Sequence, residues 1–124
     1  MMSTKTVHEF SPGDFLIFQL ESGFGLLRVL DVTEIDGEPV WHLAAYRDLF
    51  LDVEMAEQAI ANPAKLQVEL PHVAITNRAF ESTQVSKLGS LPLAAKETKP
   101  LEEWATERDG HVSDRSIRLL LGLR

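Results

Sequence analysis

The stretch that decides the fold covers residues 12–46 and reads PGDFLIFQLESGFGLLRVLDVTEIDGEPVWHLAAY. Its apolar residues fall into three runs, at 15–20, 24–35 and 40–46, with turn residues between them. The Asp36-Gly37 pair between the second and third runs strongly favours a two-residue hairpin, because both residues tolerate positive φ. We therefore expect a three-stranded antiparallel meander in this half of the chain.

The first of these runs is apolar at four successive positions, Phe15-Leu16-Ile17-Phe18. Successive side chains of a strand point to opposite faces of the sheet, so a strand with one wet face would alternate. We expect this strand to be covered on both faces, by helices from the rest of the chain.

The remaining residues predict shorter elements. Asp52 suits the N-cap of a helix that Asn62-Pro63 ends, and Ser113 suits the N-cap of a last helix. The other expected elements are a strand at 66–70 that Pro71 bends or ends, resumed pairing at 73–75, a strand at 84–88, and a helix around 101–105 that Gly110 ends.

These elements predict an α+β fold. The expected form is β-rich: an antiparallel curved sheet, or a partly open small barrel, with two or three short helices. We assign residues 1–124 to a single domain, in which residues 1–9 form a loose terminus.

The composition excludes several classes of protein. The chain has 124 residues and no cysteine, which rules out disulfides and thiolate chemistry. The apolar runs are too short to span a membrane, and the N-terminus lacks the apolar core of a signal peptide. We expect a soluble, cytoplasmic protein that does not enter membranes.

The net charge is −7, from 12 Lys and Arg against 19 Asp and Glu, which disfavours binding to nucleic acid. Residues 6–62 hold eleven acidic side chains against Arg28 and Arg47. This half of the chain is either a solvated face or a docking surface for a basic protein. The first candidates for partner binding surround the second hairpin, and the next follow it: Asp31, Glu34, Asp36 and Glu38, then Asp48, Asp52, Glu54 and Glu57.

Catalytic and metal motifs are absent from the sequence. The histidines do not stand at the close spacing of a metal pair, and no Gly-x-Ser-x-Gly elbow occurs. Gly23-Phe24-Gly25 lacks the lysine of a phosphate loop, and a hairpin with a close backbone approach explains it better. We assign no catalytic residue, no metal and no cofactor, and we expect His42, Trp41 and Trp104 to be packing residues.

The basic residues allow an alternative. Arg115 and Arg118 stand three apart in the last predicted helix and would share a face, which suits either RNA or the acidic half of the chain. Arg28 lies among apolar residues, and we expect it to pair with Asp31 or Asp48 unless it binds a ligand.

Several short motifs together resemble a known family. They are Gly13-Asp14-Phe15, the Gly23-Phe24-Gly25 hairpin followed by Arg28-Val29-Leu30, and residues 84–89 followed by Leu91-Pro92-Leu93. This pattern resembles the twenty-sixth immunity-protein family of bacterial polymorphic toxin systems, over about residues 12–100. The resemblance implies a β-rich protein that neutralises a cognate toxin by tight binding, without catalysis.

Four functions follow as hypotheses. The first is a non-enzymatic protein-binding domain, in the sense of an immunity protein that binds a basic toxin through its acidic residues. The alternatives are a small RNA- or ribosome-associated barrel that uses Arg115 and Arg118, an enzyme with a site assembled from His42, Arg28 and Asp48, and a structural subunit that completes its sheet as a homodimer.

Overall fold

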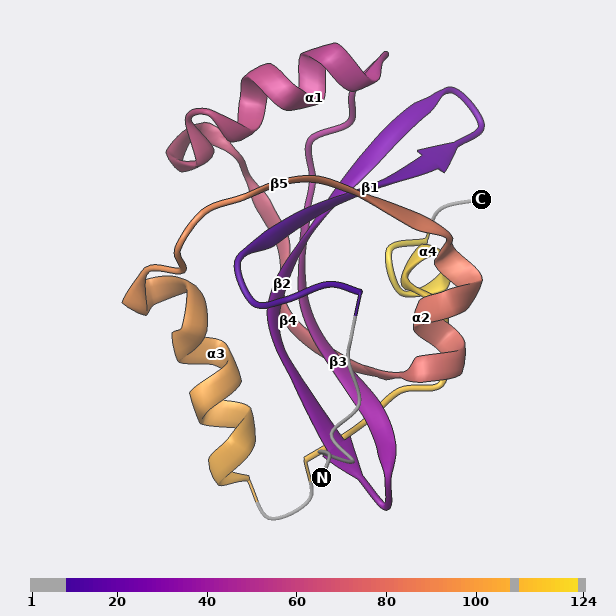
Figure 1. Ribbon diagram of the computed structural model, residues 1–124, viewed down its shortest axis with the longest axis vertical. Helices are drawn as coiled ribbons and strands as arrows, with labels where there is room; N and C mark the ends of the chain where they lie inside the picture. The colour runs from indigo at the N-terminus through magenta and orange to yellow at the C-terminus, as the bar shows by residue number, and fades with distance from the viewer. Residues whose placement is uncertain (1–8, 108–109, 123–124) are drawn as a thin grey trace, which may run out of the picture.

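The computed structural model describes residues 9–107 and 110–122 and has five strands and four α-helices in these ranges (Figure 1). The elements in chain order are β1 (Asp14–Leu20), β2 (Gly23–Ile35), β3 (Glu38–Tyr46), α1 (Val53–Ile60), a 3₁₀ turn η1 (Pro63–Lys65), β4 (Val68–Thr76), α2 (Asn77–Thr83), β5 (Val85–Ser90), α3 (Ala95–Thr106) and α4 (Ile117–Leu120). The prediction that residues 1–9 form a loose terminus falls, for residues 1–8, outside the described residues.

The strands form one open antiparallel sheet in the order β4-β3-β2-β1-β5. The predicted α+β class and the three-stranded meander are confirmed, and the sheet does not close into a barrel. Asp36 and Gly37 both have positive φ, of 53° and 81°, as the two-residue turn requires. Pro71 lies on edge strand β4 beside a register irregularity, which agrees with the expected bend.

Both faces of the sheet are covered. Leu16, Phe18 and Trp41 pack on one face with Phe80 of α2 and Ile117 of α4. On the other face Phe15, Leu26 and Tyr46 pack with Ile60 of α1 and Leu88. Figure 1 shows α3 on one side of the sheet and α2 with α4 on the opposite side. The four residues from Phe15 to Phe18 are all buried, as the apolar run predicted, and Asp14 before them is buried as well.

Gly25 explains part of the glycine-rich connector. A Cβ atom at this position would lie 2.4 Å from the Phe18 ring, so only glycine lets the ring cross the backbone of β2. The interpretation of Gly23-Phe24-Gly25 as a hairpin with a close backbone approach is therefore confirmed.

Three predictions about the second half need correction. Helix α2 was not expected, because few apolar residues mark it; the Thr76 hydroxyl caps it by accepting from Ala79 N. Helix α3 begins at Ala95, before Pro100, because Glu97 accepts from the Ala94 N–H and holds the first turn. Ser113 is no helix cap: it forms a parallel bridge with Ile75 at the edge of β4, and Ser116 caps α4 instead.

Arg28 does not pair with Asp31 or Asp48 as expected. Its guanidinium is 1% exposed and donates to Gly13 O (2.6 Å), Pro92 O (3.3 Å) and Glu97 Oε2 (3.1 Å). It also lies 4.0 Å from the centre of the Phe15 ring. Its partners come from segments far apart in the sequence, and no pattern within one strand could have identified them.

Replacing Arg28 by methionine is expected to lower the free energy of unfolding by about 3–5 kcal/mol, because Glu97 and two carbonyl groups lose a buried partner. Denaturant unfolding of Arg28→Met, Glu97→Gln and the double variant measures the coupling between the two charges. Arg47→Met is the matched control, since Arg47 is 66% exposed and bonds Glu69 at the surface. Its effect should stay below about 1 kcal/mol. Equal losses at Arg28 and Arg47 would contradict the assignment of Arg28 as a structural anchor.

Candidate functional site

Seven of the eight predicted acidic residues lie towards two ends of the sheet, while Asp31 lies within β2 opposite His42. Phe24 pairs with Phe50 at the start of β2, so the residues after Phe50 lie near that end. The β2–β3 turn stands eleven residues further along the same strand, about 35 Å away at the rise of a strand. Figure 1 shows α1 at one end of the molecule and the tip of the hairpin at the other. The first group is Asp31, Glu34, Asp36 and Glu38, and the second is Asp48, Asp52, Glu54 and Glu57.

Three of these acids have local structural partners. Asp52 accepts from Met55 N at 2.8 Å as the predicted cap of α1. Asp48 accepts from Gln67 N at 2.7 Å, and Asp31 accepts from Val32 N at 2.8 Å. Their carboxylates are therefore already engaged in holding turns and strand irregularities.

The end of the hairpin extends beyond its neighbours in the sheet. Pairing of β1 with β2 stops at Arg28, and pairing of β3 with β4 starts at Val40. Among the described residues no further strand lies beside residues 33–39, which form a two-stranded ribbon that we call the hairpin tip. Glu34, Asp36 and Glu38 are all exposed on it.

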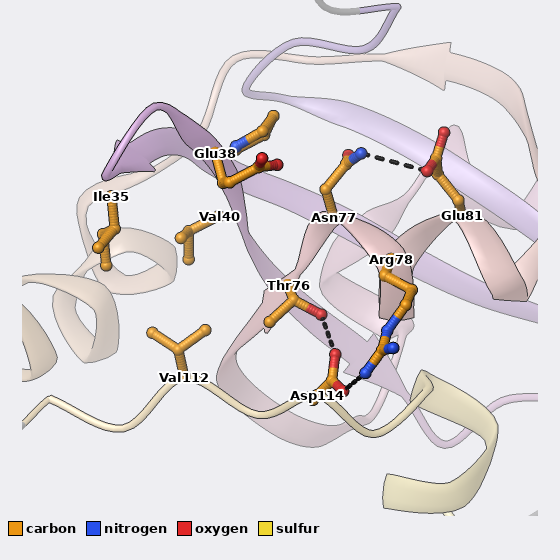
Figure 2. Close-up of a pocket in the computed structure, with 10 residues that line it drawn as sticks. Ile35, Glu38, Val40, Thr76, Asn77, Arg78, Glu81, Val112 and Asp114 are labelled. Atoms are coloured by element: carbon orange, nitrogen blue, oxygen red, sulfur yellow. Dashed lines mark hydrogen bonds and ion pairs between the residues drawn. The ribbon is translucent and has the colours of Figure 1, made fainter.

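A hollow of about 590 Å³ lies between the hairpin tip and α2, and we call it the tip groove (Figure 2). In Figure 2, Ile35, Val40 and Val112 group at one end of the groove, while Arg78 and Glu81 lie at the other. The full lining is Ile35, Glu38, Pro39, Val40, Thr76, Asn77, Arg78, Glu81, Val112 and Asp114.

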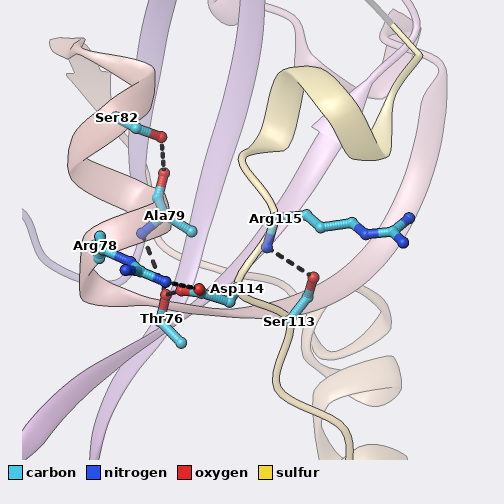
Figure 3. A network of polar contacts seen from close by, with 7 residues as sticks. All are labelled: Thr76, Arg78, Ala79, Ser82, Ser113, Asp114 and Arg115. Atoms are coloured by element: carbon cyan, nitrogen blue, oxygen red, sulfur yellow. Dashed lines mark hydrogen bonds and ion pairs between the residues drawn. The ribbon is translucent and has the colours of Figure 1, made fainter.

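A polar network joins three residues that line the groove, Thr76, Arg78 and Asp114 (Figure 2 and Figure 3). The Thr76 hydroxyl donates to Asp114 Oδ1 at 2.6 Å, and Arg78 forms an ion pair with the other oxygen of Asp114. The hydrogen bond from Arg78 lowers the pKa of Asp114, and that from Thr76 lowers it further. Asp114 is therefore ionised, and its charge is paired with that of Arg78.

The groove retains an excess of negative charge. Arg78 is neutralised by Asp114, while Glu38 and Glu81 remain, and Glu81 accepts from Asn77 Nδ2 at 3.2 Å. Together with Asp36 at the tip, these carboxylates border apolar surface that includes Ile35, which is 47% exposed. The groove suits a cationic group that carries an apolar stem, as Lys and Arg side chains do.

The two arginines proposed for RNA do not share a helix face. Helix α4 begins at Ile117, so Arg115 precedes it, and Arg118 alone of the two lies in the helix. Arg118 is half-buried, donates to Thr83 O at 3.3 Å and lies 5.8 Å from the Phe18 ring. Figure 3 shows the Arg115 side chain extending away from the Arg78–Asp114 pair.

A pair of histidines lies under α3. His42 is fully buried and its Nδ1 lies 3.0 Å from His72 Nε2, while its Nε2 lies 2.9 Å from the Thr33 hydroxyl. The Trp104 ring packs on both imidazoles, at 4.8 and 5.5 Å between centres. The predicted packing role of His42 and Trp104 agrees with these contacts. In the described ranges no three His, Asp or Glu side chains gather in a way that would hold a metal.

Burial controls the protonation of this pair. It lowers the pKa of His72 to about 4, with a further contribution from the charge of His42, and it lowers the pKa of His42, against which Asp31 acts. Both imidazoles are thus neutral near pH 7 and share one hydrogen bond.

The pair predicts a loss of stability in mild acid. Below its ordinary pKa of 6.5 an unfolded histidine takes up a proton that folded His72, with a pKa of about 4, does not. The free energy of unfolding should therefore fall as the pH drops from 6.5 towards 4, by about 2 kcal/mol between pH 7 and pH 5 for His72. Urea unfolding of wild type, His72→Gln and the exposed control His111→Gln measures this. The His72 variant should lose that part of the pH dependence; equal slopes in all three would contradict it.

The residues proposed for an enzymatic site are not assembled. His42 bonds Thr33 and His72, Arg28 bonds Gly13, Pro92 and Glu97, and Asp48 bonds Gln67 N. Within the part of the chain that the structure describes, no hydrogen bond or ion pair joins these three side chains to one another.

Several residues of these sites were not predicted from the sequence. Thr76, Glu81 and Asp114 reach the tip groove through the unexpected helix α2 and the bridge at Ser113. His72 meets His42 through the register of β3 and β4, in which His42 lies opposite Ala74. A signal existed only for Thr76, a good N-cap residue before a helix.

Comparisons with protein-family models, with curated proteins and with solved structures find no match for the chain. The resemblance to the immunity-protein family thus stays a prediction. No helix among the described residues has the length and apolarity to cross a membrane.

Proposed function

We propose that this chain is a non-enzymatic protein-binding domain that captures a basic partner at the hairpin tip and the tip groove. The observation that carries the proposal is the position of Glu34, Asp36 and Glu38, which are exposed on a ribbon that extends past the sheet, beside a groove with further carboxylates.

The geometry favours binding in three ways. A two-residue turn with its required positive φ values holds the ribbon in one conformation, so little order has to be gained on association. The carboxylates attract and orient a basic surface before contact. The apolar end of the groove, with Ile35 and Val112, offers area to bury once water is expelled.

The partner class we favour is a basic toxin of a bacterial polymorphic toxin system, which would make the chain an immunity protein of the cytoplasm. The resemblance of residues 12–100 supports this class, and carboxylates on a ribbon suit the groove with which a nuclease holds phosphates. No cofactor takes part in this function. The second group of acids, from Asp48 to Glu57, lies at the other end of the sheet and is not part of the proposed surface.

Reversing the tip charges is expected to abolish capture of the partner. We propose affinity capture from the native host with wild type and with the Glu34→Lys, Asp36→Lys, Glu38→Lys variant, which should lose a basic protein that wild type retains. Retention should also weaken as salt rises, because exposed charges are screened.

The matched control reverses three exposed acids at the other end of the molecule, Glu21→Lys, Glu54→Lys and Glu57→Lys. It has the same net charge as the tip variant and should capture the partner as wild type does. Loss of the partner in both variants would show that net charge alone matters, and retention in both would exclude the hairpin tip.

A further inference from the structure

A second concave region lies on the α3 side of the sheet, and we call it the Tyr46 cleft. Two adjoining hollows of about 280 and 320 Å³ share Tyr46, Val68, Lys96 and Glu97. Their buried floor includes Leu30, and α3 and β4 form the walls. This size and a mostly apolar floor with a few polar groups are typical of sites for small molecules.

The Tyr46 hydroxyl has no hydrogen-bond partner among the described residues, although the side chain is only 6% exposed. Other buried polar side chains of the sheet, such as Arg28 and His42, are hydrogen-bonded. The oxygen of this hydroxyl still reaches the surface of the cleft, because among the described residues Arg118 Nε is the fully buried side-chain nitrogen or oxygen without a partner. A ligand acceptor in the cleft would replace water at the Tyr46 hydroxyl. Burial raises the pKa of Tyr46 to about 12, which keeps the hydroxyl protonated and able to donate.

The charge left open to a ligand at the cleft is positive, although the carboxylates of Glu97 and Asp48 also act on Tyr46. Lys96 is exposed at its rim and Arg28 lies at its base. The Glu97 carboxylate is already satisfied, because one oxygen accepts from Arg28 Nε and the other from Ala94 N. The N-terminus of α3 also lies here, and the Glu97 carboxylate caps it by accepting from Ala94 N. Lys96 forms no ion pair within the described residues, so its ammonium supplies the open positive charge of the cleft.

We propose that the Tyr46 cleft binds a small organic anion with an apolar or aromatic body. The body would lie on the floor beside Leu30 and Val68, and the anionic group would accept from the Tyr46 hydroxyl next to the Lys96 ammonium. This site is separate from the hairpin tip and does not depend on a protein partner.

A pair of fluorescent probes tests the proposal on the full chain. Anilinonaphthalenesulfonate has an aromatic body and one anionic group, and N-phenylnaphthylamine has the same rings without the sulfonate. We expect saturable binding of the sulfonate at one site, weakened about fivefold to tenfold in Tyr46→Phe by the loss of one hydrogen bond. Lys96→Gln should weaken the sulfonate about threefold or more and leave the neutral amine unchanged.

The control is Lys99→Gln, an exposed lysine of the same helix that does not line the cleft, and it should bind both probes as wild type does. Lys96 is exposed, so the Lys96→Gln variant should keep the fold. It therefore tests the binding site even if Tyr46→Phe changes the packing of the core. Amide resonances of Tyr46, Lys96 and Glu97 should shift on titration. Non-saturable binding, or equal affinities in the Lys96 and Lys99 variants, would overturn the proposal.

Discussion

The guanidinium of Arg28 is the interaction on which much of the structure depends. A full charge buried at the centre of a sheet is tolerated only where every direction offers a partner. Here the partners are the Gly13 carbonyl before β1, the Pro92 carbonyl after β5, and Glu97 in the first turn of α3. One side chain therefore joins the start of the meander to the segment that leads into α3.

The position of α3 in turn determines both features on that side of the sheet. With its first turn held by Arg28, the helix lays Trp104 over His42 and His72 and borders the Tyr46 cleft with Lys96 and Glu97. His42 extends the connection to the hairpin, because its Nε2 lies 2.9 Å from Thr33 on the neighbouring strand. A chain of polar contacts beneath α3 thus reaches the base of the ribbon that we propose as the binding surface.

The elements that the sequence predicted are those whose cause is local. Alternation, the apolar run at 15–18 and the Asp36-Gly37 pair act over a few residues, so the meander, the turn and the burial of β1 on both faces followed from them. The cap at Asp52 has the same origin. The elements that could not be predicted depend on tertiary contacts. Helix α3 continues through Pro100, and its first turn is held by the contact between Glu97 and Arg28. Ser113 pairs with β4 and does not cap a helix. The sequence showed how many acidic residues the first half of the chain holds, but not where they lie. Their separation into groups follows from the strand register.

That separation changes what the net charge means. A uniformly acidic surface would attract a basic molecule in any orientation. Acidic side chains that are divided between two ends would instead attract a basic partner to one end or the other, in a definite orientation. At the α1 end, the carboxylates of Asp48 and Asp52 accept hydrogen bonds from backbone N–H groups. At the hairpin tip, Glu34, Asp36 and Glu38 stand on or beside a two-residue turn with positive φ at Asp36 and Gly37, and they border the tip groove. Exposed apolar side chains occur at both ends of the molecule, so within the described residues the tip is distinguished by carboxylates without backbone partners and not by Ile35.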